Sequence, residues 1–230
     1  ALEIPVVSGN VSLYNETEGR AIKPTPTVGL VGLVEDVTRL ASSGFRAEGD
    51  LIALLGELGG ELAGSEYLQA VHGLTAGRPA ALDWDRERAV LGACRAMVRE
   101  GVLQSAHDCA EGGLAVALLE SCIAGVTPIG AIVPDMLAQS QRPSEVASSH
   151  SERRWDALLF GEASARIVLS FKPSDRARVE ALAHQHLAPI LLIGHTGGDR
   201  IEIAGALNEP LSELSGIYHD AFVDGIFRRR

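Results

Sequence analysis

Apolar and polar residues follow two patterns along this chain, and together they predict strands and helices in an irregular order. Apolar residues that alternate with polar ones, or form short runs bounded by Gly and Pro, predict strands. Strands are expected at residues 4–7, 27–34, 50–56, 129–133, 166–171, 190–195 and 200–203. The last two are separated by Thr196-Gly197-Gly198-Asp199, which is typical of a hairpin turn.

Apolar residues spaced three and four apart predict helices in other parts of the chain. One helix begins at Asp83 or Asp85 and ends at Glu100, with Gly101 stopping it. Its apolar stripe comprises Ala89, Val90, Ala93, Ala96 and Met97. Further helices are expected at residues 65–74, 111–122, 174–187 and 211–227, and the polar residues 135–154 predict a surface loop.

The order of these elements predicts an α+β fold, with a mixed β-sheet and helices packed on it. A doubly wound fold would alternate strands and helices strictly, and this chain does not. The 230 residues are 46% hydrophobic and 22% charged, which suits one large or two small domains with a true core.

The net charge and the cysteines disfavour several kinds of partner and site. The formal net charge of −10 disfavours nucleic acid or an anionic membrane as the main partner. Cys94, Cys109 and Cys122 show no CxxC spacing, and their odd number argues against a disulfide framework or a zinc cluster. No signal peptide or bilayer-length apolar run is present, so the predicted compartment is the cytoplasm.

The opening segment carries the most chemical information. Pro5-Val6-Val7-Ser8-Gly9-Asn10-Val11-Ser12 is an apolar run that ends in small polar residues. Such turns can present backbone N–H groups and oxygen ligands to a phosphate or a hydrated metal. An ordinary hairpin turn is the alternative, slightly favoured by spacing alone. The chain also opens at Ala1 inside an expected strand, which predicts a fragment of a longer protein.

A later motif is a weaker candidate. Ser105-Ala106-His107-Asp108-Cys109-Ala110-Glu111-Gly112-Gly113 directly precedes an apolar helix. Asp108 can cap that helix, the glycines can leave its N-terminus open to an anion, and His107 can act as a base or a phosphate donor. The alternative is a histidine bonded into the core beside glycines that permit close packing.

Several segments together resemble phosphoribosylformylglycinamidine (FGAM) synthase, the large synthetase subunit of purine biosynthesis. The resemblance lies in SGNVSLYNE, PTPTVGLVGLVEDV, LGGELAGSEYL, SAHDCAEGGLAVALLESC and LLFGEASARIVLS, which span nearly the whole chain. It implies that residues 1–26 are the end of an upstream N-type domain with its linker. Residues 27–230 are then a C-type domain like the C-terminal domain of AIR synthetase.

The resemblance also implies roles for single residues. Gly9 would contact ATP, Asn10 would ligate Mg²⁺, and Ser12 would contact the formylglycinamide ribonucleotide substrate. Glycine permits close approach of a phosphate, and the amide and hydroxyl oxygens suit the other two ligands. Glu162 would form an ion pair with Arg166 or serve a nucleotide-like pseudo-site, although Ser164 and Ala165 depart from the family's usual Gln and Ser.

The implied activity is that of an ATP- and Mg²⁺-dependent ligase that uses ammonia from a glutaminase subunit or domain, with a small accessory subunit in multi-subunit forms. The family's catalytic histidine and several magnesium carboxylates lie upstream, so this chain alone is predicted to be inactive. The alternatives are another enzyme of the AIR-synthetase superfamily, or a non-catalytic scaffold that holds a structural nucleotide.

Overall fold

A computed structural model of the chain describes residues 2–134 and 154–227, the last six of these by their backbone. The chain divides into two units, Ala1–Thr38 and Arg39–Arg230. The predicted loop at residues 135–154 lies, except for Arg154, outside the described residues. The domain boundary expected at residues 26 and 27 stays a prediction about the longer protein.

The first unit contains little regular structure. Its one hairpin pairs β1 (Glu16–Thr17) with β2 (Arg20–Ala21) in antiparallel fashion. The strands predicted at residues 4–7 and 27–34 are wrong, because neither segment pairs with another strand in the described structure. Alternating apolar residues favour a strand only where a partner completes its hydrogen bonds.

In the described part of the second unit, seven strands form one sheet in the order β4-β6-β3-β7-β5-β8-β9. Neighbouring strands are antiparallel except for the parallel pair β5 and β8, so the predicted mixed sheet is confirmed. The strands are β3 (Leu51–Leu55), β4 (Ser105–Asp108), β5 (Ala131–Val133), β6 (Ile167–Phe171), β7 (Ile190–Thr196), β8 (Arg200–Ile203) and β9 (Leu207–Pro210).

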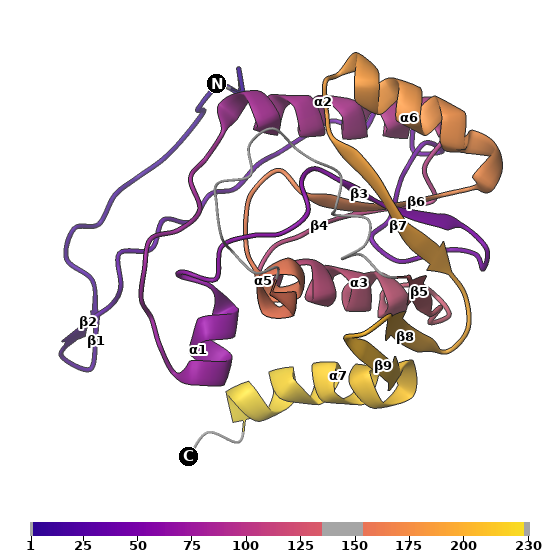
Figure 1. The fold of residues 1–230 in the computed structure, drawn as a ribbon. Coiled ribbons are helices and arrows are strands. Elements are labelled where there is room, and N and C mark those ends of the chain that lie inside the picture. Colours follow the sequence, from indigo (N-terminus) through magenta and orange to yellow (C-terminus); the bar gives the residue numbers. More distant parts are fainter. Residues whose placement is uncertain (1, 135–153, 228–230) are drawn as a thin grey trace. The chain divides into compact units, whose positions relative to one another are not determined.

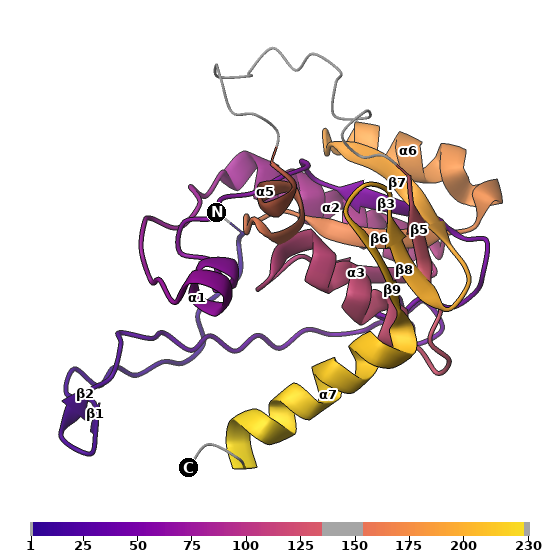
Figure 2. The same ribbon diagram turned by 60° about the horizontal axis from the view of Figure 1, so that its bottom comes forward.

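Helices cover both faces of this sheet (Figures 1 and 2). One apolar cluster packs α2 (Trp84–Glu100) and α6 (Arg176–Gln185) on one face, with a short 3₁₀ turn, Pro173–Asp175, leading into α6. The other cluster packs α3 (Gly113–Ile123), α5 (Trp155–Phe160) and the start of α7 (Leu211–Phe227) on the opposite face. The central strands are therefore buried on both sides, as their apolar runs require.

Helix α2 shows how the local sequence sets its boundaries. Asp83 accepts hydrogen bonds from the backbone N–H groups of Asp85 and Arg86, at 3.0 and 3.1 Å. Gly101 ends the helix in the left-handed conformation, at φ 69°. Val90, Ala93 and Met97 from the predicted stripe are buried.

Candidate functional site

The residues predicted to form a site fall in both units. Gly9, Asn10 and Ser12 lie in the first unit, in a segment without strand or helix, and all three are exposed. Gly9 has open space on the side where a Cβ would lie. These groups are accessible to a ligand, and their individual roles stay predictions. His107, Asp108 and Glu162 belong to the second unit.

In the second unit, three loops meet at one end of three neighbouring strands. Because β6 runs antiparallel to both β3 and β4, it begins at the end of the sheet where β3 and β4 finish. The loops that follow β3 and β4 therefore gather beside the loop that precedes β6. These loops comprise residues 56–65, 109–112 and 161–166.

Arg166 holds these loops together from inside. Its residue is only 3% exposed, and its guanidinium donates to the carbonyl oxygens of Gly59 (2.8 Å), Gly161 (2.7 Å) and Ala163 (3.3 Å). Burial lowers its pKa. Among the described residues no salt bridge joins Arg166 to Glu162, because the guanidinium is directed to backbone carbonyls. Of the predicted ion pair there remains only the charge of Glu162, which opposes the lowering of the Arg166 pKa.

Glu162 joins the same loops through its carboxylate and its backbone. Its Oε1 accepts hydrogen bonds from the backbone N–H groups of Gly112 and Glu66, each at 2.9 Å. Gly112 is the N-cap of α3, and Glu66 is the first residue of α1 (Glu66–His72). An internal carboxylate thus takes the place at α3 where an external anion was considered.

Glycines permit the close contact between these loops. A Cβ on Gly60 would lie 2.5 Å from the Gly161 carbonyl carbon, and one on Gly113 would lie 2.7 Å from the Gly161 oxygen. Gly113 also has φ +67°, which disfavours other residues. The sequence predicts close packing at Gly112 and Gly113, and the structure confirms it at Gly113.

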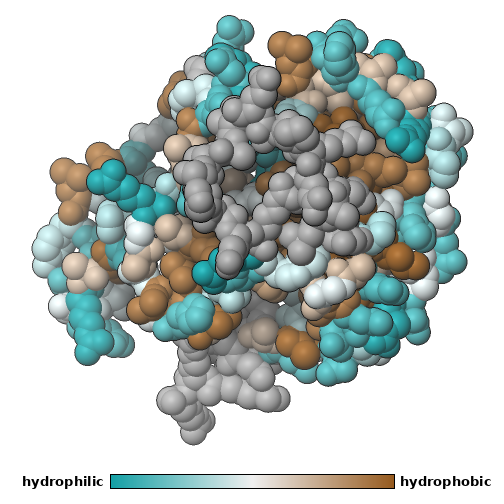
Figure 3. Space-filling view, viewed as in Figure 1, coloured by the Kyte–Doolittle hydropathy of each residue, from teal (hydrophilic) through white to brown (hydrophobic). Residues whose placement is uncertain are grey.

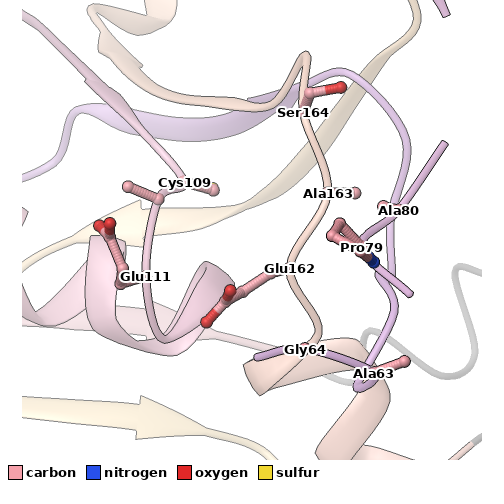
Figure 4. Close-up of a pocket in the computed structure, with 10 residues that line it drawn as sticks. Ala63, Gly64, Pro79, Ala80, Cys109, Glu111, Glu162, Ala163 and Ser164 are labelled. Atoms are coloured by element: carbon pink, nitrogen blue, oxygen red, sulfur yellow. The ribbon is translucent and has the colours of Figure 1, made fainter. Parts of the chain in front are cut away.

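A cavity of about 290 Å³ lies between the loops (Figure 4). Cys109 and Glu111 lie on one side of it, Pro79 and Ala80 lie on the other, and Glu162 projects between them. A neighbouring cavity of about 350 Å³ shares Ala80, Ala163 and Ser164 and also includes Arg166. Small side chains and backbone make up much of both linings.

His107 belongs to a hydrogen-bonded network rather than to either cavity lining. Its Nε2 lies 2.8 Å from a carboxylate oxygen of Glu120 on α3, and the Tyr218 hydroxyl of α7 donates to the other oxygen at 2.7 Å. This hydrogen bond raises the pKa of Tyr218. The arrangement agrees with a histidine bonded into the domain. Neither Glu120 nor Tyr218 could be predicted from the sequence, because the His107–Glu120 and Tyr218–Glu120 contacts are tertiary.

Asp108 does not cap α3, so that expectation is wrong. It is the last residue of β4, and the N-cap is Gly112, which forms no side-chain cap. The Asp108 carboxylate instead lies 3.6 Å from His107 Nδ1 and is largely exposed. The strand Ser105–Asp108 places it too early in the chain to reach the first turn of the helix.

The three cysteines are free thiols in the structure. Cys109 and Cys122 are buried, and Cys94 is partly buried. Burial raises the pKa of Cys94 and Cys109 to about 11 and that of Cys122 to about 12. At neutral pH all three are protonated and poorly nucleophilic.

Comparison with known families decides where this fold belongs. Residues 47–205 match the family described as AIR synthase related protein, C-terminal domain. That range contains both cavities, the His107–Glu120 pair and the loops that Arg166 holds together. The chain belongs to this family.

Relatives of this AIR synthase related chain bear the name phosphoribosylformylglycinamidine synthase subunit PurL. The protein from Anaeromyxobacter dehalogenans is 51% identical over 230 residues, and that from Thermomicrobium roseum is 43% identical over 223 residues. They confirm the resemblance to FGAM synthase. The AIR synthase related chain spans 29% of the length of each of these relatives, whereas they cover 100% and 97% of it.

Solved structures confirm the AIR synthase related fold. The Thermotoga maritima PurL complexed with FGAR matches with a TM-score of 0.59 and 21% identity, over 78% of this chain and 30% of that one. The same protein complexed with ATP gives a TM-score of 0.56, with 21% identity, over 78% of this chain and 28% of that one. At this identity the match establishes the α+β architecture.

Two kinds of feature were looked for in the described parts of this AIR synthase related chain: clusters of metal-ligating side chains and membrane-spanning helices. No group of three or more His, Cys, Asp or Glu side chains is placed there to hold a metal ion. None of the helices described combines the length and apolar character needed to cross a bilayer.

Proposed function

We propose that this chain is part of a cytoplasmic FGAM synthase, to which it contributes one loop of the active site and a supporting domain. The observation that carries the proposal is the 51% identity over 230 residues with the PurL subunit of Anaeromyxobacter dehalogenans. Residues 1–26 would be the end of an N-type domain of the longer protein with its linker, and residues 27–230 would form the C-type domain.

The proposed reaction converts formylglycinamide ribonucleotide, ATP and ammonia to the amidine. ATP phosphorylates the amide oxygen of the substrate, and ammonia then displaces phosphate as the new C–N bond forms. Gly9 would allow the ATP phosphates to approach the backbone, and Ser12 would bond a substrate oxygen. Both residues are exposed, as this role requires.

Asn10 fits a magnesium ion as one ligand among several. Its amide oxygen is a hard donor, and Mg²⁺ in phosphoryl-transfer sites is commonly held by one or two protein oxygens together with phosphates and water. The ion would neutralise charge on the phosphates. Asn10 would position it beside the groups that Gly9 and Ser12 bind.

The second unit supports a scaffolding role better than a nucleotide site of its own. The Gly112 N–H at the start of α3 is bonded to Glu162, and Arg166 donates to three backbone carbonyls. These groups are therefore already engaged within the domain. The catalytic groups, the glutaminase and the small accessory subunit would be supplied by other parts of the enzyme.

Substitution in the full-length protein tests the role of the loop. With ammonium chloride as nitrogen source, Asn10→Ala should lower kcat/KM by roughly 100-fold, as loss of a group that holds a catalytic metal does. Raised Mg²⁺ should restore part of the activity. Asn15→Ala, five residues further along in the same unit, is the matched control and should retain activity. Equal activity of both variants would refute the assignment of Asn10.

Calorimetric titration of magnesium-ATP then separates the two proposed roles. The isolated chain should bind no nucleotide and the full-length protein should bind it, because the chain supplies only one wall of the site. Equal binding by the isolated chain would place a complete nucleotide site within these residues. It would favour the structural-nucleotide alternative over a shared active site.

A further inference from the structure

Helix α2 carries arginine and apolar side chains on the side turned away from the sheet. They recur three or four positions apart, so they share one face of the helix, here called the outer face of α2. Its members are Trp84, Arg88, Leu91, Arg95 and Arg99, and all five are exposed. Three positive charges and no carboxylate thus lie along this face, in a chain whose net charge is −10.

An open hollow of about 680 Å³ adjoins the first half of the outer face. Arg88 and Ala89 line it from α2, and His186, Leu187 and Pro189 line it from the segment that follows α6. Helices α2 and α6 lie side by side on the same face of the sheet (Figures 1 and 2). The hollow therefore joins the outer face of α2 to the residues after α6 in one continuous surface.

Leu187 on this surface is held in a conformation that leucine disfavours. Its φ of 58° is left-handed, the conformation that Gly73 and Gly101 take where α1 and α2 end. Its N–H donates to the His184 carbonyl at 3.0 Å, which closes the last turn of α6. Its side chain is 83% exposed, so burial does not offset the strain. An exposed side chain kept against local preference is expected at functional surfaces.

The other apolar members of the surface are large and half exposed. Trp84 is 48% exposed and Leu91 is 45% exposed, and Arg88 lies between them on the helix. Tryptophan and arginine are the residue types that contribute most to binding at protein interfaces. A mixture of arginine with a few apolar groups is typical of subunits that associate after folding, since permanent interfaces are more apolar.

Charge indicates what can cover this surface. Among the described residues, no salt bridge joins Arg95 or Arg99 to a carboxylate. Arg88 pairs with Asp85, whose side chain is 90% exposed, and such a pair is weak. A second copy of the chain would set the arginines of one outer face against those of the other. A surface with carboxylates and apolar groups complements both features.

We propose that the outer face of α2 and Leu187 form a docking surface for a separate, acidic protein subunit of the enzyme. Apolar side chains of that subunit cover Trp84, Leu91 and Leu187, and its carboxylates pair with Arg95 and Arg99. The inference rests on the proposed function, in which a glutaminase and a small accessory subunit join this protein. It adds the place on this domain where such a subunit binds.

Association in solution tests the docking surface. Full-length protein would be mixed with the purified glutaminase and accessory subunit, and the dissociation constant measured by sedimentation velocity. Arg95→Glu should weaken association roughly ten-fold, since it sets a carboxylate against carboxylates, and the difference should shrink at high salt. Arg78→Glu makes the same charge change at an exposed residue outside α2 and α6, and is the matched control.

Leu187→Gly separates binding from folding. Glycine takes the left-handed conformation without strain, so the variant should melt at a temperature at least as high as that of the wild type. It should nevertheless weaken association several-fold, because the exposed side chain is lost. Unchanged association would refute the role of Leu187, as would a loss of binding that appears only together with a loss of stability.

Activity with two nitrogen sources distinguishes failure of this inference from failure of the proposed function. Arg95→Glu should lower glutamine-dependent turnover and leave ammonium-dependent turnover unchanged. A wild-type protein that uses neither source would refute the proposed function. An active protein in which Arg95→Glu and Arg78→Glu bind alike would refute only the docking surface. Protection of Arg95 from phenylglyoxal in the full-length protein alone would assign the surface to the rest of the same polypeptide and refute a separate subunit.

Discussion

Asp50 shows how one buried side chain can make folding depend on pH. The residue is 4% exposed and lies just before β3, where its N–H donates to Thr196 Oγ1 at 3.0 Å. Within the described structure its Oδ2 has no hydrogen-bond partner. Burial raises the pKa of Asp50, and nearby Lys172 opposes this change. The folded state therefore holds this proton more tightly than the unfolded state does.

The direction of this pKa shift leads to a prediction for Asp50→Asn. Wild-type stability from this group is fully present below the ordinary aspartate pKa and is lost as pH rises through the raised folded value. The free energy of unfolding of the variant, relative to wild type, should therefore increase from about pH 3.5 to pH 7. Urea unfolding at both pH values measures it. Asp199→Asn, in the exposed turn before β8, is the control.

Single-residue roles could be predicted only in part from the sequence. The sequence predicts a role for Gly112 and Gly113 in close packing and names Glu162, in the loop before β6, as a candidate site residue. It does not predict the hydrogen-bond partners of Glu162 and Arg166. Those partners are backbone groups, and backbone groups leave no residue-type pattern. Glu162 reaches Gly112 across 50 positions and Glu66 across 96. Such contacts arise only when the sheet brings three loops together.

At the scale of elements, it can be tested directly whether Asp83 stabilises α2 as its N-cap. The backbone hydrogen bond from the Arg86 N–H lowers the pKa of Asp83 most, and that from Asp85 lowers it further. The stabilisation is therefore present above the ordinary aspartate pKa and is lost as pH falls through the lowered folded value. Asp83→Ala should lower the urea midpoint at pH 7, and the difference should shrink in acid. Asp83→Asn keeps an acceptor and should retain most of the stability. An Ala variant as stable as wild type at pH 7 would contradict the cap.

Elements with strong local signals were predicted well, and those made by tertiary pairing were missed. Helix α2 has a cap, a stripe and a terminal glycine, and strand β8 was predicted at its observed bounds. By contrast, β4 is a polar run of four residues that becomes a strand by pairing with β6. Strand β9 and helix α5 are also short and were not predicted. Short elements depend on their neighbours more than on their own sequence.

At the scale of the whole chain, exposed apolar residues predict self-association. In the first unit, Val6, Leu13 and Val31 are each at least 92% exposed. Figure 3 shows hydrophobic residues among hydrophilic ones on the surface. The isolated chain should therefore associate, whereas residues 39–230, which contain both apolar clusters, should be monomeric with a similar urea midpoint. Sedimentation equilibrium distinguishes them, and association of both proteins to the same extent would refute the prediction.

The strand order of the sheet has a consequence for synthesis on the ribosome. Strand β3 lies between β6 and β7, and its partners begin at Ile167 and Ile190. At roughly 5–20 residues per second, translation reaches β7 about 7 to 30 seconds after β3. Until β6 is synthesised the apolar run from Ile52 to Leu55 has neither neighbour, and until β7 follows it has only one. The nascent chain thus needs shielding, by a chaperone or by the ribosome surface, for most of the time that this domain takes to emerge.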